Sequence, residues 1–367
     1  MSLRWHILTG EYPPEIGGVA GYTAQLATAL ANAGDAVTVW TPGSTLPDRF
    51  GPRSEAVLYP ALRQEPGIVL LQYVPNALGA RGMNLRFCRW LRDRGREGMD
   101  VRVMFHEPYF YFTASRPWRN VLAAVQRVMA RALLDASRTA YVSTESWRHY
   151  LTPRRGMSLE VLPIPSNIPP AAAPTPDTYR GAIAPGGGPI AGHFGTYGDD
   201  VADELVRVLP GVAQLCPAAR FAFIGRGSRE FLSRLGETHP DLPERSWASG
   251  ALDTTDVSCA LRACDVLVQP YPDGITTRRT SAMAGLQHGV PTVTTNGDLT
   301  EPIWADSKAV ALAPVADASA FAAAVAALLD DNAAARALGR RGADAYARHF
   351  SLERTLAVLR GSPGVAS

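Results

Sequence analysis

Two adjacent arginines, Arg278 and Arg279, stand where the sequence predicts the start of a short helix. The segment QPYPDGITTRRTSAMAGLQHGVPTV, residues 269–293, has the pattern of a buried strand, a glycine turn and a helix over 278–288 with Thr277 as its N-cap. A helix start carries unpaired N–H groups and a partial positive charge, so cations there are unfavourable unless an anion joins them. The pair therefore predicts an anion site that suits a diphosphate.

Asp273 and Gly274 precede the arginines on the same turn. A carboxylate there can accept hydrogen bonds from sugar hydroxyls, and a glycine backbone lets a ligand come close. The alternative is a pair of solvated arginines with Asp273 as their neutralising partner.

A second candidate loop is GEYPPEIGGVAGY, in which Gly17 and Gly18 precede a predicted helix. Bare backbone at a helix start can approach a phosphate or a sugar, although two glycines can also simply form a tight turn. A dinucleotide fingerprint would need a glycine at position 16, where isoleucine stands, and the next strand, VTVWTPG, ends without an acid for a ribose. A nicotinamide or flavin dehydrogenase is therefore disfavoured.

A third candidate is His106, which with Glu107 follows the predicted strand VRVMF. A zinc protease would need a second histidine at position 110, which is phenylalanine. His106 can bond a substrate hydroxyl or phosphate, and a purely structural role is the open alternative.

The elements that must position these residues form two series. The chain has 367 residues, 46% of them hydrophobic, which suggests two domains of ordinary globular composition. Apolar runs alternate with helical patterns, first from WHILTG to TAYVSTE and again from IAGHFG to VPTVTTNG. This alternation predicts parallel sheets covered by helices on both faces, with ligands bound beyond the strands' carboxyl ends in an interdomain cleft.

The predicted boundaries follow composition. They are a Rossmann-like domain at 1–168, a proline- and glycine-rich linker at 169–189, a second Rossmann-like domain at 190–345, and a C-terminal helical segment at 346–367. The last segment is expected to pack back on the first domain.

Charge is spread unevenly along the chain. The formal net charge is only +2, which gives no support to nucleic-acid binding, yet residues 81–160 hold fifteen arginines and seven acids. This segment is either a solvated basic face or faces an anionic partner such as a phospholipid surface. Basic and apolar residues also mix over 116–134, which either leans on a membrane or packs in the core.

Cysteine usage and the N-terminus indicate the compartment. The four cysteines form no C-x-x-C pair, no signal-peptide pattern opens the chain, and no apolar run is long enough to span a bilayer. The sequence therefore predicts a cytoplasmic protein, peripheral at most at the inner face of a membrane.

Together these motifs resemble the GT-B glycosyltransferases of the large retaining family 4, the group 1 glycosyl transferases. The matching pieces are YPPEIGGVAGY, the FHE at 105–107, IPSNIP, FIGRG and, above all, ACDVLVQPYPDGITTRRTSAMAGLQHGVPTVTTNGDLTEPI, in the family's order and spacing over essentially the whole chain. The resemblance implies an α/β GT-B fold and transfer of a sugar from a nucleoside-diphosphate sugar with retention. It also implies no separate cofactor and, because no D-x-D sequence occurs, no metal for the diphosphate.

The resemblance implies that the domain at 1–168 is the acceptor side and that the domain at 190–345 binds the nucleotide sugar, and it assigns roles to individual positions. The catalytic candidates are His106, Asp273, Arg278 and Arg279, and the donor-binding candidates are Gly17, Gly18, Gly195, Gly274, Ile275, Thr276, Thr277, Ser281 and Glu301.

Two departures from the family pattern affect these assignments. The family has glutamates where this chain has Asp273 and Ser281, and it carries cations after the first strand of its second domain, where this chain reads HFGTYGDDVADE. Arg278 and Arg279 are expected to supply the missing charge from the opposite loop. The alternatives are a catalytically inactive nucleotide-sugar binding protein and a different GT-B enzyme, such as an epimerase or a phosphorylase. The acceptor, donor base and oligomeric state are not predicted.

Overall fold

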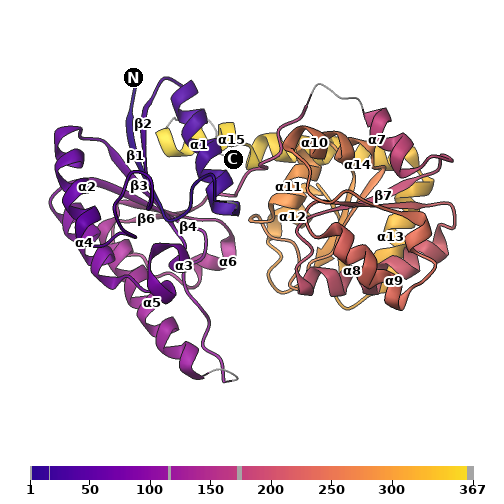
Figure 1. Ribbon diagram of the computed structural model, residues 1–367, viewed down its shortest axis with the longest axis horizontal. Coiled ribbons are helices and arrows are strands. Elements are labelled where there is room, and N and C mark those ends of the chain that lie inside the picture. The colour runs from indigo at the N-terminus through magenta and orange to yellow at the C-terminus, as the bar shows by residue number, and fades with distance from the viewer. Residues whose placement is uncertain (1, 16, 115–116, 172–175, 362–367) are drawn as a thin grey trace. The chain divides into compact units, whose positions relative to one another are not determined.

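The computed structural model describes residues 2–15, 17–114, 117–171 and 176–361. It divides into two compact units (Figure 1). Unit 1 comprises residues 1–164 and 352–367, and unit 2 comprises residues 165–351. Each unit contains a six-stranded sheet.

The sheet of unit 1 is parallel throughout and has the order β2-β1-β3-β4-β5-β6. Its strands are β1 (Arg4–Thr9), β2 (Ala36–Trp40), β3 (Ile68–Tyr73), β4 (Asp100–Phe105), β5 (Thr139–Val142) and β6 (Ser158–Val161). The inner strands are almost continuously buried, as expected for a parallel sheet covered on both faces.

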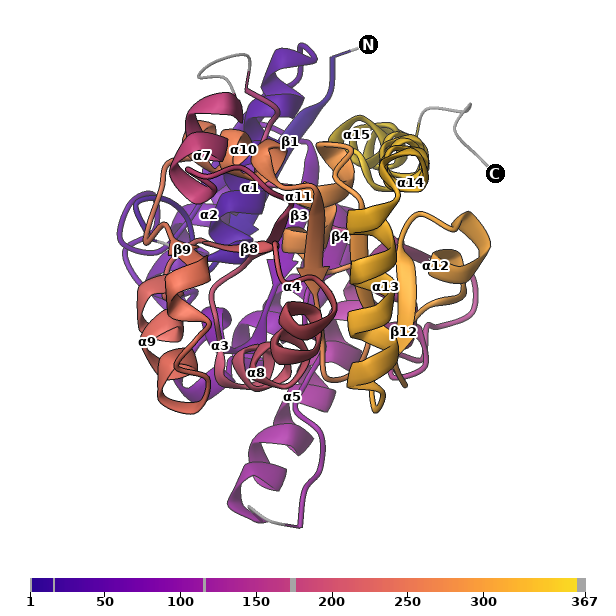
Figure 2. The ribbon, with the colours of Figure 1, turned by 90° about the vertical axis from the view of Figure 1, so that its right-hand side faces the viewer.

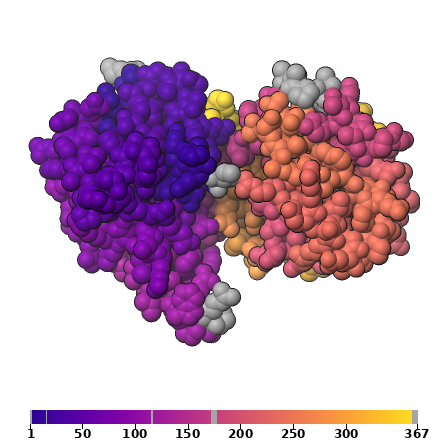
Figure 3. All heavy atoms as spheres, in the orientation of Figure 1, coloured from indigo at the N-terminus to yellow at the C-terminus, as the bar shows by residue number. Residues whose placement is uncertain are grey.

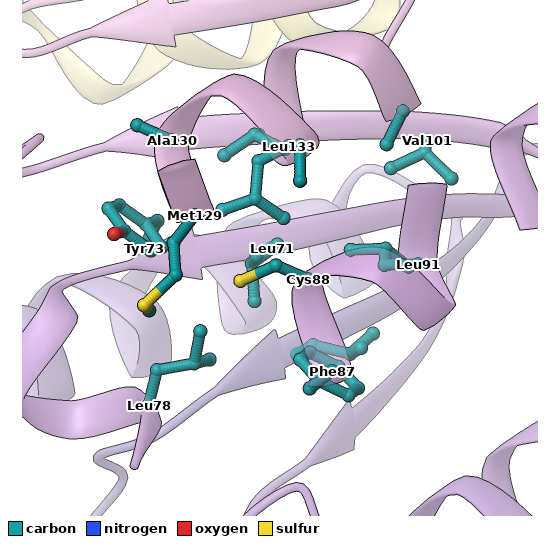
Figure 4. Packing of buried hydrophobic residues seen from close by; sticks show 14 of the residues in the cluster. Leu71, Tyr73, Leu78, Phe87, Cys88, Leu91, Val101, Met129, Ala130 and Leu133 are labelled. Carbon is teal, nitrogen blue, oxygen red and sulfur yellow. The ribbon is translucent and has the colours of Figure 1, made fainter. Parts of the chain in front are cut away.

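Helices cover both faces of this sheet. One face carries α1 (Gly18–Asn32) and α15 (Leu352–Arg360), and the other carries α2 (Pro52–Gln64), α4 (Leu85–Arg96) and α5 (Pro117–Ala136). Short helices α3 (Pro75–Leu78) and α6 (Glu145–Arg148) lie in the loops. Figure 4 shows the packing beneath α4 and α5, where Leu71, Cys88, Leu91, Met129 and Leu133 meet in one buried cluster.

The C-terminal helix α15 belongs to unit 1 because polar bonds and apolar packing hold it there. The guanidinium group of Arg360 pairs with the buried Asp35 carboxylate at 3.3 Å. Arg102 donates to the carbonyl oxygen of Leu359 at 2.5 Å, and the Leu359 side chain is buried against β1 and α1 residues.

Unit 2 has a parallel sheet of order β12-β11-β10-β7-β8-β9. Its strands are β7 (Ile190–Phe194), β8 (Arg220–Ile224), β9 (Ser246–Ala248), β10 (Val266–Gln269), β11 (Thr292–Asn296) and β12 (Ala311–Pro314). Its helices are α7 (Pro176–Ile183), α8 (Asp199–Leu215), α9 (Ser228–Thr238), α10 (Thr254–Ala263), α11 (Thr280–Gln287), α12 (Pro302–Ser307), α13 (Ala318–Asp330) and α14 (Asn332–Ala345). Helices α8, α9 and α13 pack on one face, and α7, α10 and α11 pack on the other (Figure 2).

The observed boundaries differ from those that composition suggested. The predicted linker, 169–189, lies wholly in unit 2, and its middle part, Pro176–Ile183, forms α7, whose Ile183 is buried in the core. Residues 346–350 form a π-helical turn in unit 2, so only the part of the C-terminal segment from Leu352 onward belongs to unit 1. Short edge strands β6 and β12 were not predicted, because β6 (SLEV) mixes polar and apolar residues and β12 (ALAP) consists mostly of alanine and proline, which are weak strand formers.

None of the described helices combines the length and the apolarity that crossing a bilayer requires.

Two glycine-to-alanine substitutions should have opposite effects on stability. In α4, a Cβ on Gly95 would overlap the carbonyl oxygen of Ala136 at the end of α5, whereas a Cβ on Gly181 in α7 would meet nothing within 4 Å. Alanine normally stabilises a helix by about 0.5–1 kcal/mol relative to glycine, but overpacking costs about 1–3 kcal/mol. Gly181→Ala should therefore raise the free energy of unfolding and Gly95→Ala should lower it, as measured by urea denaturation. A stabilised Gly95→Ala protein would contradict this packing of α4 on α5.

Candidate functional site

The candidate site of unit 2 lies where its strand order reverses. β7 and β10 are neighbours in the sheet, and β8 continues from one side while β11 continues from the other. The connections after β7 and β10 therefore diverge, which leaves room beyond their carboxyl ends; open parallel sheets bind ligands at such a point. Gly195 follows β7, and the segment from Tyr271 to Arg279 follows β10.

A chain of hydrogen bonds connects these strand ends. The Gln269 side chain donates to the carbonyl oxygen of Phe194 at 3.0 Å, and the Tyr271 hydroxyl donates to Gln269 Oε1 at 3.3 Å. Tyr271 also shares a hydrogen bond of 2.9 Å with the hydroxyl of Ser281. The Ser281 side chain is thus held by a tyrosine of its own unit.

Arg279 is a partly buried cation in this region. Its guanidinium carbon lies 4.5 Å from the centre of the Tyr271 ring, and its Nε is buried without a hydrogen-bond partner among the described residues. Burial lowers the pKa of Arg279, and the charge of Arg278 lowers it further, while Asp273 and Asp200 act in the opposite direction. Because a desolvated cation beside a like charge is unfavourable, an added anion would stabilise this arrangement.

The two arginines precede the helix rather than forming its first turn, which corrects the prediction for 278–288. Helix α11 begins at Thr280, and Arg279 occupies the N-cap position with its carbonyl oxygen accepting from the N–H of Met283 at 3.1 Å. Thr277 is not the cap, because its N–H and its hydroxyl both donate to the side chain of Glu301.

The buried carboxylate of Glu301 fixes the loop before α11. Its Oε2 accepts from the backbone N–H of Thr277 at 2.8 Å and from the indole N–H of Trp304 at 3.0 Å, and its Oε1 accepts from the Thr277 hydroxyl at 2.6 Å. Both oxygens are engaged within the protein. These bonds give Glu301 and Thr277 a positioning role in this loop, and their predicted contact with a donor stays a prediction.

Gly274 is required by packing. Its φ is +88°, and a Cβ there would collide with the Thr300 hydroxyl and the backbone of Gly297, so this loop lies directly on the loop after β11. Ile275 is buried and donates its N–H to the carbonyl oxygen of Thr295 at 2.9 Å. Gly274 is therefore needed for loop-on-loop contact, and its predicted role of making room for a ligand stays a prediction.

Two further groups of the turn differ in exposure. Asp273 is exposed, whereas the hydroxyl of Thr276 is buried without a hydrogen-bond partner among the described residues. A buried hydroxyl left in this state can still donate to a ligand oxygen.

Gly195 lies beside a histidine that sequence reasoning passed over. A Cβ on Gly195 would stand 2.9 Å from Nε2 of His193, whose Nδ1 bonds the carbonyl oxygen of Val268 at 2.8 Å. Burial lowers the pKa of His193 to about 4. The imidazole is thus neutral, and it fills the space directly behind the loop after β7.

In unit 1, His106 directly follows β4 and is buried. Its Nε2 lies 2.7 Å from Oε1 of Gln72 in the neighbouring strand β3, and its ring meets the edge of Tyr22 at 5.2 Å. Burial lowers the pKa of His106 to about 3, so the ring is neutral at pH 7. Since Gln72 Oε1 can only accept, Nε2 carries the proton and Nδ1 keeps a lone pair. A neutral acceptor nitrogen suits a hydroxyl group better than a phosphate.

The glycine pair of unit 1 opens helix α1. Gly17 has an extended backbone at the N-cap, and Gly18 begins the helix with nothing within 4 Å of its Cβ position. A Cβ on Gly17 would lie 2.7 Å from a carboxylate oxygen of Glu11. Burial raises the pKa of Glu11, and the charges of Glu15 and Glu107 add to this effect. Of the two ligands that the sequence left open here, these carboxylates favour a sugar over a phosphate.

Gln72 and Tyr271 were missed by sequence reasoning. Gln72 is an amide side chain inside the largely apolar strand IVLLQY, and Tyr271 is the aromatic residue directly after VLVQP. A polar residue inside a buried strand, or an aromatic residue at a strand end next to an arginine pair, would have been the signal in each case.

A comparison with family models finds a match to the group 1 glycosyl transferases over residues 188–331. The resemblance indicated by the motifs is thus confirmed for this part of the chain, which includes the Asp273–Arg279 turn. Among curated proteins, none matches the chain by sequence.

Several solved structures share the fold over nearly the whole chain. Sucrose-phosphate synthase from Thermosynechococcus elongatus is 17% identical, with 98% of each chain covered and a TM-score of 0.69. Anabaena HepE in complex with UDP and glucose is 12% identical, with 98% of this chain and 99% of the other covered and a TM-score of 0.67. WaaG, a glycosyltransferase involved in lipopolysaccharide biosynthesis, is 15% identical, with 98% and 100% covered and a TM-score of 0.64. The predicted α/β GT-B fold with two Rossmann-like domains is confirmed, while the interdomain cleft stays a prediction.

Burial of neutral His106 should make stability fall in mild acid. The unfolded chain binds a proton at this histidine below its ordinary pKa of 6.5, whereas the folded chain does so only near pH 3. Stability is therefore lost as pH falls from 6.5 toward 3, by up to about 1.4 kcal/mol per pH unit for this one group. Between pH 7.5 and 5.5, His106→Gln should lose about 1 kcal/mol less of its free energy of unfolding than the wild type, measured by urea denaturation.

The matched control is His149→Gln, at an exposed histidine of the same unit. It should keep the wild-type pH dependence. An equal dependence in all three proteins would show that His106 is not held neutral in the folded state.

Proposed function

We propose that this chain is a glycosyltransferase that moves a sugar from a nucleoside-diphosphate sugar to an acceptor hydroxyl. The observation that carries the proposal is Arg279, a partly buried guanidinium group next to Arg278 at the strand-order reversal of unit 2, whose Nε has no hydrogen-bond partner in the described part of the chain. The family match over 188–331 and the UDP complex of HepE support the same reading.

Unit 2 is the proposed donor-binding unit. Arg278 and Arg279 neutralise the diphosphate, since guanidinium groups form charge-assisted, bidentate bonds with phosphate oxygens. Asp273, exposed on the turn before them, accepts hydrogen bonds from the sugar hydroxyls. The buried Thr276 hydroxyl, which bonds to none of the described residues, is a further donor to the same ligand.

Ser281 takes the place of a carboxylate in the family pattern, and its hydroxyl is already bonded to Tyr271. This pair can still offer one hydroxyl hydrogen bond to the nucleoside, but without the negative charge that a glutamate would bring. We therefore expect binding of the nucleotide to depend more on the arginines than on hydrogen bonds to the ribose.

Unit 1 is the proposed acceptor-side unit. The neutral His106 offers a hydrogen-bond acceptor at Nδ1 for a sugar hydroxyl, and the carboxylates of Glu11, Glu15 and Glu107 favour a hydroxyl-rich ligand beside the start of α1. The open space at Gly18 leaves room for that ligand.

We propose a transfer with retention of configuration. The bond between the sugar's anomeric carbon and the donor phosphate oxygen breaks, and the acceptor oxygen bonds to the same face of that carbon. The acceptor's proton passes to the departing phosphate oxygen, so the products are a glycoside and a nucleoside diphosphate. The protein's part is mainly electrostatic: the two arginines stabilise the charge that develops on the leaving diphosphate. With two guanidinium groups in this role, the proposal needs neither a metal ion nor a separate cofactor.

Removal of both arginines should abolish tight binding of the diphosphate. Charge-assisted hydrogen bonds contribute about 1.5–3 kcal/mol each, so Arg278→Ala/Arg279→Ala should weaken affinity at least about 100-fold. Calorimetric titration with UDP, GDP, ADP and dTDP measures this for whichever nucleotide binds the wild type best.

The control is Arg336→Ala/Arg340→Ala, which removes the same charge from exposed positions of α14 in the same unit. This protein should keep wild-type affinity. Equal affinity of the Arg278/Arg279 double variant would defeat the assignment of the arginines to the diphosphate.

Turnover separates an enzyme from an inactive binding protein. A retaining transferase whose acceptor is absent should slowly hydrolyse the bound nucleotide sugar, because water can take the acceptor's place. Release of free sugar from the preferred donor, followed by chromatography, should exceed that of Asp273→Ala by at least about tenfold. Tight binding of the donor with no sugar released would instead identify a nucleotide-sugar binding protein.

A further inference from the structure

An apolar arm is exposed on unit 1. We define the arm as the loop after β4, residues 108–114, together with the first part of α5, residues 117–131. Among the described residues, eight large apolar side chains are exposed, and six of them belong to the arm or touch it: Tyr111, Phe112, Trp118, Val121, Val128 and Tyr150. The arm projects from the rest of unit 1 (Figures 1 and 3). Such a concentration marks an interaction surface.

The arm is held in shape by its own hydrogen bonds. The N–H of Phe110 donates to Oε1 of Gln126 at 2.9 Å, and Arg127 donates to the carbonyl oxygen of Phe110 at 3.0 Å. Nearer the tip, Asn120 and Thr113 exchange two hydrogen bonds of 2.9 and 3.1 Å. The loop therefore lies fixed along the helix, and its aromatic residues are displayed by an ordered scaffold.

Helix α5 is apolar on two sides. Met129 and Leu133 are fully buried in the core of unit 1 (Figure 4). Trp118, Val121 and Val128 recur at helical spacing on the outer side, with 65%, 65% and 49% of their surface exposed. An ordinary surface helix is polar on its outer side. The core-packing alternative left open by the sequence therefore accounts for the inner side of α5 but not for the outer one.

The charge of the arm has one sign. Residues 108–134 contain four arginines and no aspartate or glutamate. Arg119 lies over the ring of Phe110 at 4.6 Å, and Arg127 lies over the ring of Phe112 at 3.9 Å. The exposed aromatic residues and the cations are thus adjacent. The described Arg131 pairs only loosely with Asp135, at 3.7 Å and with a largely exposed side chain.

We propose that the arm docks unit 1 on an anionic phospholipid bilayer. Guanidinium groups complement lipid phosphates, tryptophan and tyrosine prefer the headgroup level, and exposed valine and phenylalanine enter the acyl boundary. A protein partner of neutral or basic charge would leave the acid-free arm unmatched. The protein lies on the membrane in this proposal and does not span it.

Vesicle flotation with the full chain tests the proposal. The wild type should float with vesicles of phosphatidylcholine containing 30% phosphatidylglycerol, and less than a tenth as much should float with phosphatidylcholine alone. Raising the salt to 0.5 M should reduce the bound fraction, because the lipid surface potential is screened. Trp118→Ser/Val121→Ser and, separately, Arg119→Gln/Arg131→Gln should each reduce it at least about fivefold.

The matched control is Val57→Ser/Leu215→Ser, which removes two exposed apolar side chains away from the arm. It should float like the wild type, and all variants should keep the wild-type melting temperature and nucleotide affinity, since the changed side chains are exposed or, for Arg119, half-buried. Failure of the wild type to float on anionic vesicles would overturn the proposal. So would sedimentation of the wild type as a dimer that Trp118→Ser/Val121→Ser converts to monomer, because a second copy of the chain would then be the occupant.

Discussion

The candidate site depends on keeping a cation, Arg279, partly out of water at the end of a parallel sheet. Such a group is costly unless its surroundings compensate. The π face of the Tyr271 ring stabilises the positive charge, and the carboxylates of Asp273 and Asp200 stabilise it further. Compensation is incomplete, because Nε has no partner among the described residues and Arg278 adds a like charge, so an anion bound to the accessible part of the guanidinium group would stabilise the site.

The loop that carries the arginines is fixed before any ligand arrives. Glu301 accepts three hydrogen bonds from Thr277 and Trp304, and Gly274 lets the same loop lie on the backbone of Gly297. A carboxylate that sequence patterns associate with the donor is thus used to hold the residues that face it. Pre-organisation of this kind matters for electrostatic catalysis, since the charges need not move as the leaving group departs.

The two units offer different chemistry at their strand ends. Unit 2 presents two arginines, while unit 1 presents a neutral His106 bonded to Gln72 and a group of carboxylates near Glu11. A cationic end suits a diphosphate, and a neutral or acidic end suits hydroxyl groups. This division agrees with a donor carried by one unit and an acceptor met by the other. Helix α5 adds a separate property, because its inner side completes a core and its outer side is apolar and basic.

The sequence by itself determined much of the protein. Ten of the twelve strands could be predicted, most of them as short apolar runs, because the strands of a parallel sheet covered on both faces are largely buried, and their alternation with helices indicates a parallel sheet. His106 could be found because it directly follows such a strand, and Asp273 and the arginine pair could be found because they lie between a strand and the next helix. Edge strands β6 and β12 and helix α7 could not, because their few residues depend on neighbours for burial.

Only the tertiary structure decided how the polar groups are shared. The sequence could not show that the Glu301 carboxylate accepts hydrogen bonds from Thr277 and Trp304. Thr277 lies 24 residues before Glu301 and Trp304 lies 3 residues after it, and only the packing of the loops brings all three together. Nor could it show that α11 starts at Thr280. The local pattern favours Thr277 as the N-cap, but in the folded protein Thr277 donates its hydrogen bonds to the buried carboxylate of Glu301 instead. Local sequence patterns determine which residues lie at a strand end. Their hydrogen-bond partners depend on which distant segments the tertiary fold places next to them.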